Sequence, residues 1–346
     1  MDGTLKSANV DDERTRNLNR IFASQIQEVV RAALQGIDHI TDLRRLPGGA
    51  SQEIWTLEAV GPGLRRRLIL RRQPPGAAYP DKINLEIEAE LMRVVEAAGV
   101  PTPHVIHVLT PADGIGRGFL MEHVEGEGLG HRIVRSEAFA AIRPKLAFQI
   151  GGILAHVHGV DTAPLPMLPR KSAASEVTDM HETYRRFSQP RPVFELSFCW
   201  LRERMDTDAA AHTLVHGDFR NGNMIIGPDG LRAVLDWELA HLGDPMRDLG
   251  WLCTNSWRYG EIDKPVGGFG DRDDLVSGYE AAGGAKIDPA ALHYWEVLGT
   301  LRWGVMCIEM GARAKQSDRP VELSMIGRRA SEAEIDLLRL IAPRRT

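Results

Sequence analysis

The chain has 346 residues, of which 43% are hydrophobic and 26% are charged, and its formal net charge is -5. The length allows two lobes around a cleft, and the composition is that of an ordinary soluble globular protein. This charge excludes a global basic footprint, so we expect no nucleic-acid partner and no attraction to an anionic membrane.

The cysteine content and the N-terminal sequence indicate in which cellular compartment the protein is expected. Three widely spaced cysteines, Cys199, Cys253 and Cys307, argue against a disulfide framework or a cysteine-based zinc site and fit a reducing environment. The N-terminus lacks the apolar stretch of a signal peptide, and the longest apolar segment, residues 146–160, is too short and too polar to span a bilayer. We therefore expect a cytoplasmic protein with no membrane partner, and a homodimer is left open.

The first part of the chain predicts one helix followed by an antiparallel sheet. Apolar residues recur at helical spacing over residues 18–34, and then the period changes to that of strands. Strands are predicted at residues 40–46, 54–60, 68–72, 105–109 and 118–124, with one helix inserted at residues 83–98. Residues 1–37 are thus an N-terminal extension with its helix, and residues 38–124 form a β-rich lobe.

After residue 126 the pattern is mainly helical. Helices are predicted at residues 144–158 and 194–206, with a proline-rich loop at 162–169 between them, and helical character returns after Pro245. A β-rich island at residues 214–237 interrupts this lobe, which covers residues 125–346. The expected fold class is α+β, with a β-rich N-terminal lobe and a mainly helical C-terminal lobe that carries one β-hairpin.

The β-island, LVHGDFRNGNMIIGPDGLRAVLDWE, carries the polar residues of a phosphoryl-transfer site. A short strand ends at His216 and Asp218, Asn223 follows five residues after Asp218, and a second strand delivers Asp236. We expect a two-stranded hairpin to bring the two carboxylates and the amide together. One carboxylate and one amide oxygen suffice for Mg²⁺ that keeps positions for phosphate. Asp218 could then orient an alcohol toward a γ-phosphorus, and Arg220 would offset the charge of the transferring group.

The segment HGDFRNGN followed by LDWE resembles the catalytic signature of the aminoglycoside phosphotransferase/choline kinase superfamily, small-molecule relatives of protein kinases. The resemblance implies a protein-kinase-like two-lobed fold, the cofactors ATP and Mg²⁺, and a small-molecule hydroxyl acceptor. It makes Asp218 the catalytic aspartate and Asn223 and Asp236 the metal ligands, while His216 braces the loop and Arg220 takes the place of a phosphate-contacting lysine. The alternative is a histidine and an aspartate satisfied within a turn.

The segment GDPMRDLGW looks like the usual sequel of this signature. Asp244 and Asp248 within it are expected to be structural, either capping a helix or holding the catalytic loop.

The resemblance also implies nucleotide-binding residues in the β-rich lobe. LPGGASQEIW looks like the family's nucleotide-covering loop, in which Gly48, Gly49 and Ser51 would offer backbone N–H groups to phosphate, although a plain hairpin turn is the alternative. LILRRQPPG places the phosphate-binding cation at Arg71, where most kinases have lysine. The alternative there is an exposed arginine on an edge strand.

An acidic partner for Arg71 is expected on the helix at residues 83–98. Counting back from the GVPTP turn favours Glu88, with Glu90 as runner-up. The alternative is that both glutamates belong to a solvated helix face.

FLMEHVEGEG matches the hinge pattern of the family. Adenine would bond to the carbonyl of Glu122 and the N–H of Val124, with Met121 on the inner wall, and a plain edge strand is the alternative.

The resemblance covers about residues 38–310. Segments such as LRRQPPG, GVPTPHVI and ILAHVHGVD look most similar to a subgroup of phosphotransferase-like proteins. That subgroup is related to the kinase-like domain of some acyl-CoA dehydrogenases.

Specificity for the acceptor is expected to come from about residues 130–210 and from beyond 245. The aromatic and basic residues there hint at an acceptor less cationic than an aminoglycoside, such as a hydroxylated acyl compound, although core packing is the alternative for the tryptophans. These residues are Trp237, His241, Trp251, Trp257, His293, Arg302 and Trp303.

Two other functions compete with a small-molecule kinase. One is a nucleotide-binding regulatory protein without turnover, against which the intact β-island argues. The other is a protein kinase, which is disfavoured because no activation-loop sequel follows LDWE. The sequence leaves open the acceptor, the choice between ATP and GTP, and the role of the N-terminal helix.

Overall fold

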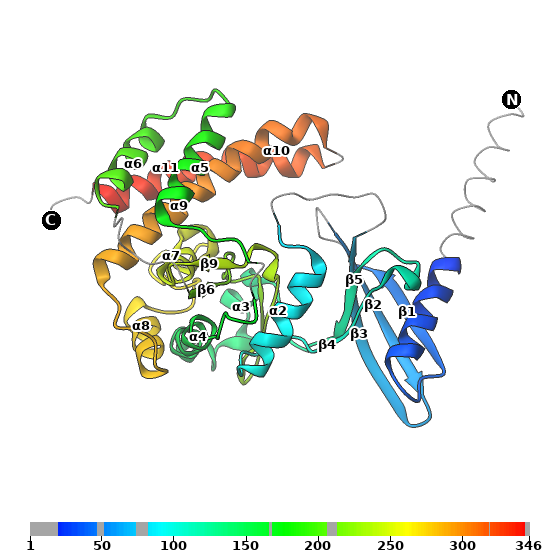
Figure 1. Ribbon diagram of the computed structural model, residues 1–346. Coiled ribbons are helices and arrows are strands. Elements are labelled where there is room, and N and C mark those ends of the chain that lie inside the picture. Colours follow the sequence, from blue (N-terminus) through cyan, green and yellow to red (C-terminus); the bar gives the residue numbers. More distant parts are fainter. Residues whose placement is uncertain are drawn as a thin grey trace, which may run out of the picture. The chain divides into compact units, whose positions relative to one another are not determined.

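The computed structural model describes residues 20–46, 52–73, 82–165, 168–205, 213–317 and 319–342. The chain divides into two compact units, Met1–Glu96 with Pro103–Val124, and Ala97–Thr102 with Glu125–Thr346. The first unit is built on an antiparallel sheet and the second is mainly helical (Figure 1). The predicted α+β class is therefore confirmed.

The sheet of the first unit has five strands in the order β1-β2-β3-β5-β4, and every neighbouring pair is antiparallel. The strands are β1 (His39–Arg45), β2 (Glu53–Gly61), β3 (Leu64–Gln73), β4 (Val105–Val108) and β5 (Arg117–Glu122). A two-residue turn joins β2 to β3, with Gly61 opposite Leu64, and Gly63 in that turn has φ 71°, which favours glycine. All five predicted strands are present, and β3 is longer than predicted.

Among the described residues of the first unit, two segments form α-helices. Residues 20–33 are helical, and Ile26, Val29 and Val30 on this helix are buried in one core cluster with the sheet residues Leu57 and Leu68. The N-terminal helix is therefore part of the first unit's core, while residues 1–19 of the predicted extension lie outside the described residues. The inserted helix is α2 (Leu85–Ala97), and it starts after Asn84, whose side chain accepts the N–H of Ile87 at 2.8 Å.

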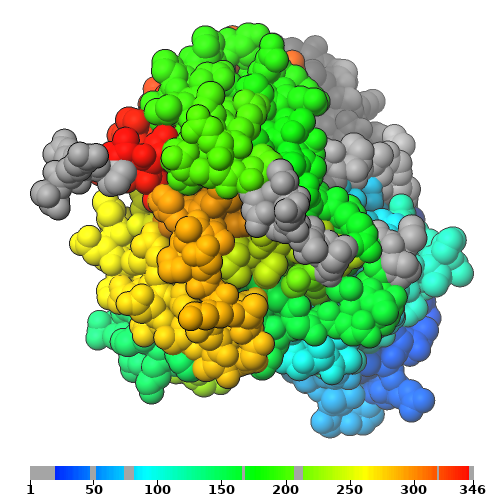
Figure 2. All heavy atoms as spheres, turned by 60° about the vertical axis from the view of Figure 1, so that its left-hand side comes forward, coloured from blue at the N-terminus to red at the C-terminus, as the bar shows by residue number. Residues whose placement is uncertain are grey.

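The second unit is organised around one long helix, α9. Its described helices are α3 (Gly130–Arg135), α4 (Arg143–His158), α5 (Ala173–Arg186), α6 (Pro192–Glu203), α7 (Met246–Cys253), α8 (Arg272–Ala281), α9 (Pro289–Arg313), α10 (Pro320–Arg328) and α11 (Ala330–Ile341). Helix α9 packs against α5, α6, α7, α10 and α11, which explains why most of its residues are buried. In Figure 2 the amber and orange segment around residues 270–295 lies at the surface, next to green residues of the α5 and α6 region.

The β-island forms two separate two-stranded sheets. Strands β7 (Met224–Gly227) and β8 (Gly230–Val234) make a hairpin, whereas β6 (Thr213–Val215) pairs with β9 (His241–Gly243). This corrects the expectation that one hairpin presents all three polar side chains. The strand before Asp218 finds its partner in a three-residue strand beyond Asp236, which the sequence did not indicate.

Within the described part of the chain, every helix is either too short or too polar to be a candidate membrane span.

Candidate active site

The loop after β6 is fixed by a tight turn and a buried histidine. Gly217 has φ 85°, and a Cβ there would lie 2.3 Å from the carbonyl oxygen of Leu239, so only glycine fits. His216 is fully buried, and its Nδ1 accepts the backbone N–H of Asp218 at 3.2 Å. Nε2 therefore carries the proton and donates to the carbonyl of Leu235 at 2.9 Å. Burial lowers the pKa of His216, which keeps the imidazole neutral as this double contact requires.

The Asp218 carboxylate receives three side-chain donors. Asn223 Nδ2 donates to Oδ2 at 2.7 Å, Trp251 Nε1 donates to Oδ1 at 2.7 Å, and Arg220 Nε lies 3.2 Å from both oxygens. The predicted proximity of Asp218, Arg220 and Asn223 is thus present in the structure. Trp251 was singled out only as an aromatic residue of the acceptor region, and its contact with Asp218 was not predicted.

Asn223 and Asp236 lie at the open end of the β7–β8 hairpin. The carbonyl of Asn223 accepts the N–H of Leu235, the residue before Asp236, at 2.9 Å. Because Asn223 Nδ2 is directed to Asp218, Oδ1 is the amide atom left for a cation. An amide oxygen and a carboxylate such as that of Asp236 are the hard oxygen ligands that Mg²⁺ prefers. Asp236 has φ 67° and ψ 59°, a left-handed conformation that is costly for a residue with a Cβ and is concentrated at functional sites.

Helix α7 holds the main chain of residues 216–223, the candidate catalytic loop (hereafter the catalytic loop), through a buried carboxylate. Asp248 accepts the N–H of His216 at 2.7 Å, the N–H of Gly217 at 2.9 Å and a hydrogen bond from His158 at 3.3 Å. Burial alone would raise the pKa of Asp248, but the hydrogen bond from His158 and the nearby positive charges, including Arg247, together outweigh burial and lower the pKa to about 2. The predicted loop-holding role of Asp248 is confirmed. The capping role of Asp244 is confirmed as well, since its Oδ1 accepts the N–H of Met246 at 2.8 Å.

A second contact from α7 was not predicted. Arg247 donates to the carbonyl of Gly217 at 2.8 Å and to Glu176 on α5 at 2.9 Å. Glu176 also lies 3.4 Å from Arg302 and 3.8 Å from His241 Nε2. Glu176 and Arg302 line a cavity of about 190 Å³ between α5 and α9. This cavity is therefore connected to the catalytic loop through one buried ion pair.

In the first unit, Arg71 and Glu88 form the predicted pair. Arg71 Nη1 lies 2.7 Å from Glu88 Oε1, both side chains are buried, and Arg71 also donates to Gln52. The reading of Arg71 as an exposed edge-strand residue is therefore wrong. The runner-up Glu90 is largely exposed and pairs with Arg93 on its own helix.

The other nucleotide-binding candidates are placed only in part. Met121 and Glu122 lie on β5 opposite Ile69 and Leu68, and the side chain of Glu122 pairs with Arg66. Val124 is the last residue of the first unit. Gly48, Gly49 and Ser51 lie outside the described residues.

The tryptophans of the predicted acceptor region are buried, and three of them form a ladder. The ring centroids of Trp251 and Trp257 are 5.1 Å apart, and those of Trp257 and Trp303 are 5.0 Å apart. The guanidinium groups of Arg302, Arg220 and Arg329 lie over these three rings at 5.5, 4.5 and 5.1 Å respectively. Core packing therefore describes the rings, but one end of the ladder also contacts Asp218.

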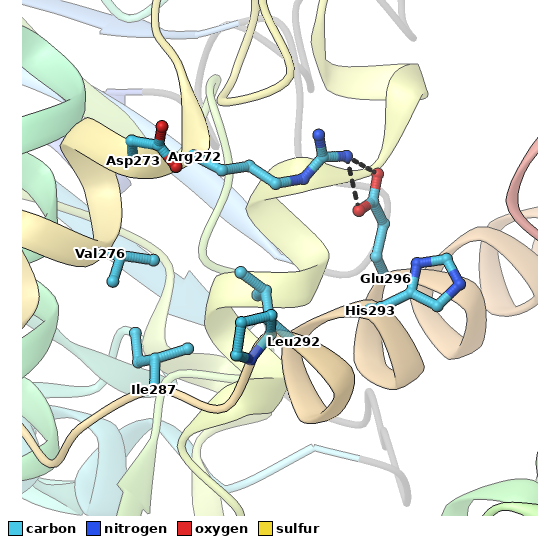
Figure 3. Close-up of a pocket in the computed structure, with 8 residues that line it drawn as sticks. Arg272, Asp273, Val276, Ile287, Leu292, His293 and Glu296 are labelled. Carbon is cyan, nitrogen blue, oxygen red and sulfur yellow. Dashed lines mark hydrogen bonds and ion pairs between the residues drawn. The ribbon is translucent and has the colours of Figure 1, made fainter.

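A larger cavity of about 420 Å³ lies between α8 and α9 (Figure 3). Arg272 reaches across it to Glu296 with contacts of 2.6 and 2.7 Å, while Val276, Ile287 and Leu292 supply apolar walls. His293 also lines this cavity. None of the donors that contact the Asp218 carboxylate is among its lining residues, so this cavity is separate from the catalytic loop.

Residues 42–285 match the model of the phosphotransferase enzyme family, APH. The chain belongs to this family. Solved structures share the fold of this phosphotransferase: a candidate aminoglycoside phosphotransferase from Ralstonia eutropha has a TM-score of 0.72 at 21% identity, covering 92% of this chain and 97% of that one. A choline kinase from Cryptosporidium parvum has a TM-score of 0.62 at 13% identity, covering 90% and 95%.

The curated relatives of this phosphotransferase are longer proteins. Acyl-CoA dehydrogenase family member 10 of Mus musculus is 30% identical over 205 residues, which are 54% of this chain and 18% of the relative. The probable acyl-CoA dehydrogenase IBR3 of Arabidopsis thaliana is 27% identical over 256 residues, which are 68% and 29% of the two chains. The chain thus spans less than a third of the length of these relatives.

Proposed function

We propose that this member of the phosphotransferase family transfers the γ-phosphoryl group of ATP to a hydroxyl group of a small molecule. The observation that carries the proposal is the Asp218 carboxylate, held by three side-chain donors, one of which is Asn223. A carboxylate held this way can accept a hydrogen bond from an alcohol and orient it for in-line attack on phosphorus.

The side chains of the second unit have distinct roles in this proposal. Asn223 and Asp236 would hold Mg²⁺, which when bound neutralises charge on the phosphate oxygens. Arg220, whose contacts with Asp218 are long and shared between two oxygens, would offset the charge of the transferring group. His216 stays neutral and fixes the loop, because it joins the N–H of Asp218 to the carbonyl of Leu235.

The first unit would bind the nucleotide. Arg71, whose guanidinium is held by Glu88, would contact phosphate, and the backbone of Glu122 and Val124 with the side chain of Met121 would receive adenine. Gly48, Gly49 and Ser51 would cover the phosphates. Solved structures of the same fold support nucleotide use, since a spectinomycin phosphotransferase is a complex with ADP and spectinomycin, and an aminoglycoside phosphotransferase is a ternary complex with AMP-PNP and hygromycin B.

The competing proposal is a kinase-like protein that binds nucleotide without turnover. The complete set of Asp218, Asn223 and Asp236 favours the enzyme.

We also propose a cytoplasmic location and a small-molecule partner. Whether the protein forms a homodimer is left open.

An ATP-consumption screen tests the proposed function. The acceptors are aminoglycosides, choline, homoserine and hydroxy-acids, the latter free and as coenzyme A thioesters. The wild-type protein is compared with Asp218→Asn, which keeps the shape of the side chain and removes its charge. Asp229→Asn is the matched control, because Asp229 is exposed at the turn of the β7–β8 hairpin.

We expect Asp218→Asn to lose acceptor-dependent ATP consumption by about 100-fold or more, since positioned proton acceptors contribute factors of this order. Asp229→Asn should keep the wild-type rate. No acceptor-dependent rate above background in either protein would favour the non-catalytic alternative, whereas equal rates above background in wild type and Asp218→Asn would show that Asp218 does not carry the reaction.

A further inference from the structure

Each oxygen of the Asp218 carboxylate has one short donor of its own. Trp251 Nε1 donates to Oδ1 and Asn223 Nδ2 donates to Oδ2, both at 2.7 Å. Arg220 Nε lies 3.2 Å from both oxygens. Two short donors on different oxygens fix the plane of a carboxylate, because rotation about the Cβ–Cγ bond would lengthen at least one of them. The long, shared contact from Arg220 is the one that an incoming hydroxyl could most readily replace.

The indole ring that supplies one of these donors is held firmly. Trp251 is 2% exposed, and its ring lies against Trp257 on one side while the Arg302 guanidinium lies 5.5 Å from its centroid. An indole N–H can only donate, and it stays neutral at every pH of interest. Its contact with Asp218 therefore does not depend on a protonation state of the tryptophan.

Helix α7 places this donor next to three main-chain contacts. Arg247 donates to the carbonyl of Gly217, Asp248 accepts the N–H groups of His216 and Gly217, and Trp251 lies one turn further along the same helix. The same helix thus fixes the backbone of the loop and, through Trp251, the direction of the Asp218 side chain.

We propose that Trp251 is a positioning residue for the phosphotransfer reaction: its indole N–H sets the orientation in which the Asp218 carboxylate receives the acceptor hydroxyl. This inference rests on the proposed function and adds to it a role for Trp251, which ends the GDPMRDLGW segment and to which the resemblance gave no part in the reaction. A residue in this role affects the chemical step and leaves nucleotide binding unchanged.

The kinetic test is Trp251→Phe, which keeps most of the aromatic surface and removes the N–H. The matched control is Trp303→Phe. Trp303 is the far member of the same ladder, it is buried, and its N–H has no hydrogen-bond partner among the described residues. Both variants lose similar ring volume, so a purely structural effect would appear in both.

We expect Trp251→Phe to lower kcat for acceptor phosphorylation by about 10- to 100-fold, the range for loss of a hydrogen bond to a charged group. The KM for ATP should stay within about twofold, and Trp303→Phe should keep kcat within about twofold. A wild-type kcat in Trp251→Phe, or an equal loss in Trp303→Phe, would overturn the assignment.

A spectroscopic measurement keeps the inference testable if Trp251→Phe does not fold. In protein labelled with ¹⁵N-tryptophan, the indole resonance of Trp251 should shift upfield in Asp218→Ala, because the N–H loses its anionic acceptor, and the Trp303 resonance should not move. An unmoved Trp251 resonance would show that the contact is absent in solution.

The two proposals can fail separately. If the wild type phosphorylates no acceptor, the proposed function and the positioning role of Trp251 fail together. A shifted resonance with a normal Trp251→Phe kcat refutes the positioning role alone.

Discussion

His241 is a buried histidine whose protonation the fold opposes. It is 1% exposed, its Nδ1 donates to the carbonyl of Leu239 at 2.9 Å, and its Nε2 faces Glu176 on α5 at 3.8 Å. Burial and the charge of Arg247 lower its pKa to about 4, although Glu176 acts in the opposite direction and Lys171 adds a smaller lowering effect. In the unfolded chain the pKa of histidine is about 6.5. Between these two values the unfolded chain binds the proton and the folded one does not, so stability falls as pH drops from about 6.5 to 4.

Replacing His241 with glutamine should remove this acid sensitivity. When the pH is lowered from 7.5 to 5, the unfolding free energy of the wild type should fall by about 2 kcal/mol more than that of His241→Gln. One pKa unit corresponds to about 1.4 kcal/mol. Urea unfolding at the two pH values measures the difference. His131→Gln, at an exposed histidine on α3, is the control and should behave like wild type. The same pH dependence in His241→Gln and wild type would show that another group is responsible.

At the residue scale, the sequence predicted those contacts that lie close together along the chain or that belong to a family motif. Asp218 and Asn223 are five residues apart, and the pairing of Arg71 with Glu88 followed from counting back from the GVPTP turn. The contacts of Trp251 with Asp218 and of Glu176 with Arg247 were missed because they join residues 33 and 71 positions apart in the chain. Such contacts depend on how α5 and α7 pack, and no local spacing encodes that.

At the scale of elements, the close approach of α7 to α9 determines where the catalytic loop is held. Gly250 on α7 faces α9 so closely that a Cβ would lie 2.5 Å from the carbonyl carbon of Trp295 and 2.7 Å from the nitrogen of Glu296. Both atoms belong to the helix backbone and cannot rotate away. Since α7 carries Arg247, Asp248 and Trp251, a shift of this helix would move every contact that it makes with the loop.

Gly250→Ala and Gly152→Ala separate helix propensity from packing. Propensity alone favours alanine over glycine by about 1 kcal/mol at both positions. At Gly250 we expect the steric conflict to win and to lower the unfolding free energy by about 1–3 kcal/mol, the usual cost of overpacking. At Gly152 on α4 a Cβ would meet its neighbours at 3.6 and 3.7 Å, so alanine should be neutral or stabilising by up to about 1 kcal/mol. Urea unfolding of both variants checks this, and a Gly250→Ala protein as stable as wild type would mean that α7 and α9 are further apart.

The elements that the sequence missed are short or lack a periodic signal. Strand β9 has three residues, and its pairing with β6 joins Thr213 to Gly243, across the entire β7–β8 hairpin. Helix α5 begins after Ser172, whose side chain accepts the N–H of Ser175, and falls in a region predicted only as mainly helical. By contrast α2 and α4 have long apolar faces and were placed within two residues of their observed ends.

At the scale of the whole molecule, each unit has its own reason for being predictable. The first has alternating strands joined by glycine and proline turns, and its N-terminal helix presents Ile26, Val29 and Val30 at helical spacing to the sheet core. The second is dominated by α9, which is too evenly apolar for the pattern to tell which face meets which neighbour. The fold class could therefore be read from the sequence, whereas the packing around α9 could not.

Nucleotide binding offers a whole-molecule test of the metal ligands, because a ligand that binds only the folded chain raises its stability. At a Mg-ATP concentration about 100 times the Kd, the gain is about 2.7 kcal/mol, which a thermal shift detects. We expect the wild type to show a Tm increase with ATP and Mg²⁺ that chelation of the metal removes. Asp236→Ala should lose this metal-dependent increase because it removes one of the two proposed protein ligands, and Asp229→Ala, at the exposed turn of the same hairpin, should retain it. If Asp236→Ala shows the same magnesium-dependent Tm increase as wild type, Asp236 is not a metal ligand. The left-handed backbone conformation of Asp236 would then need another explanation.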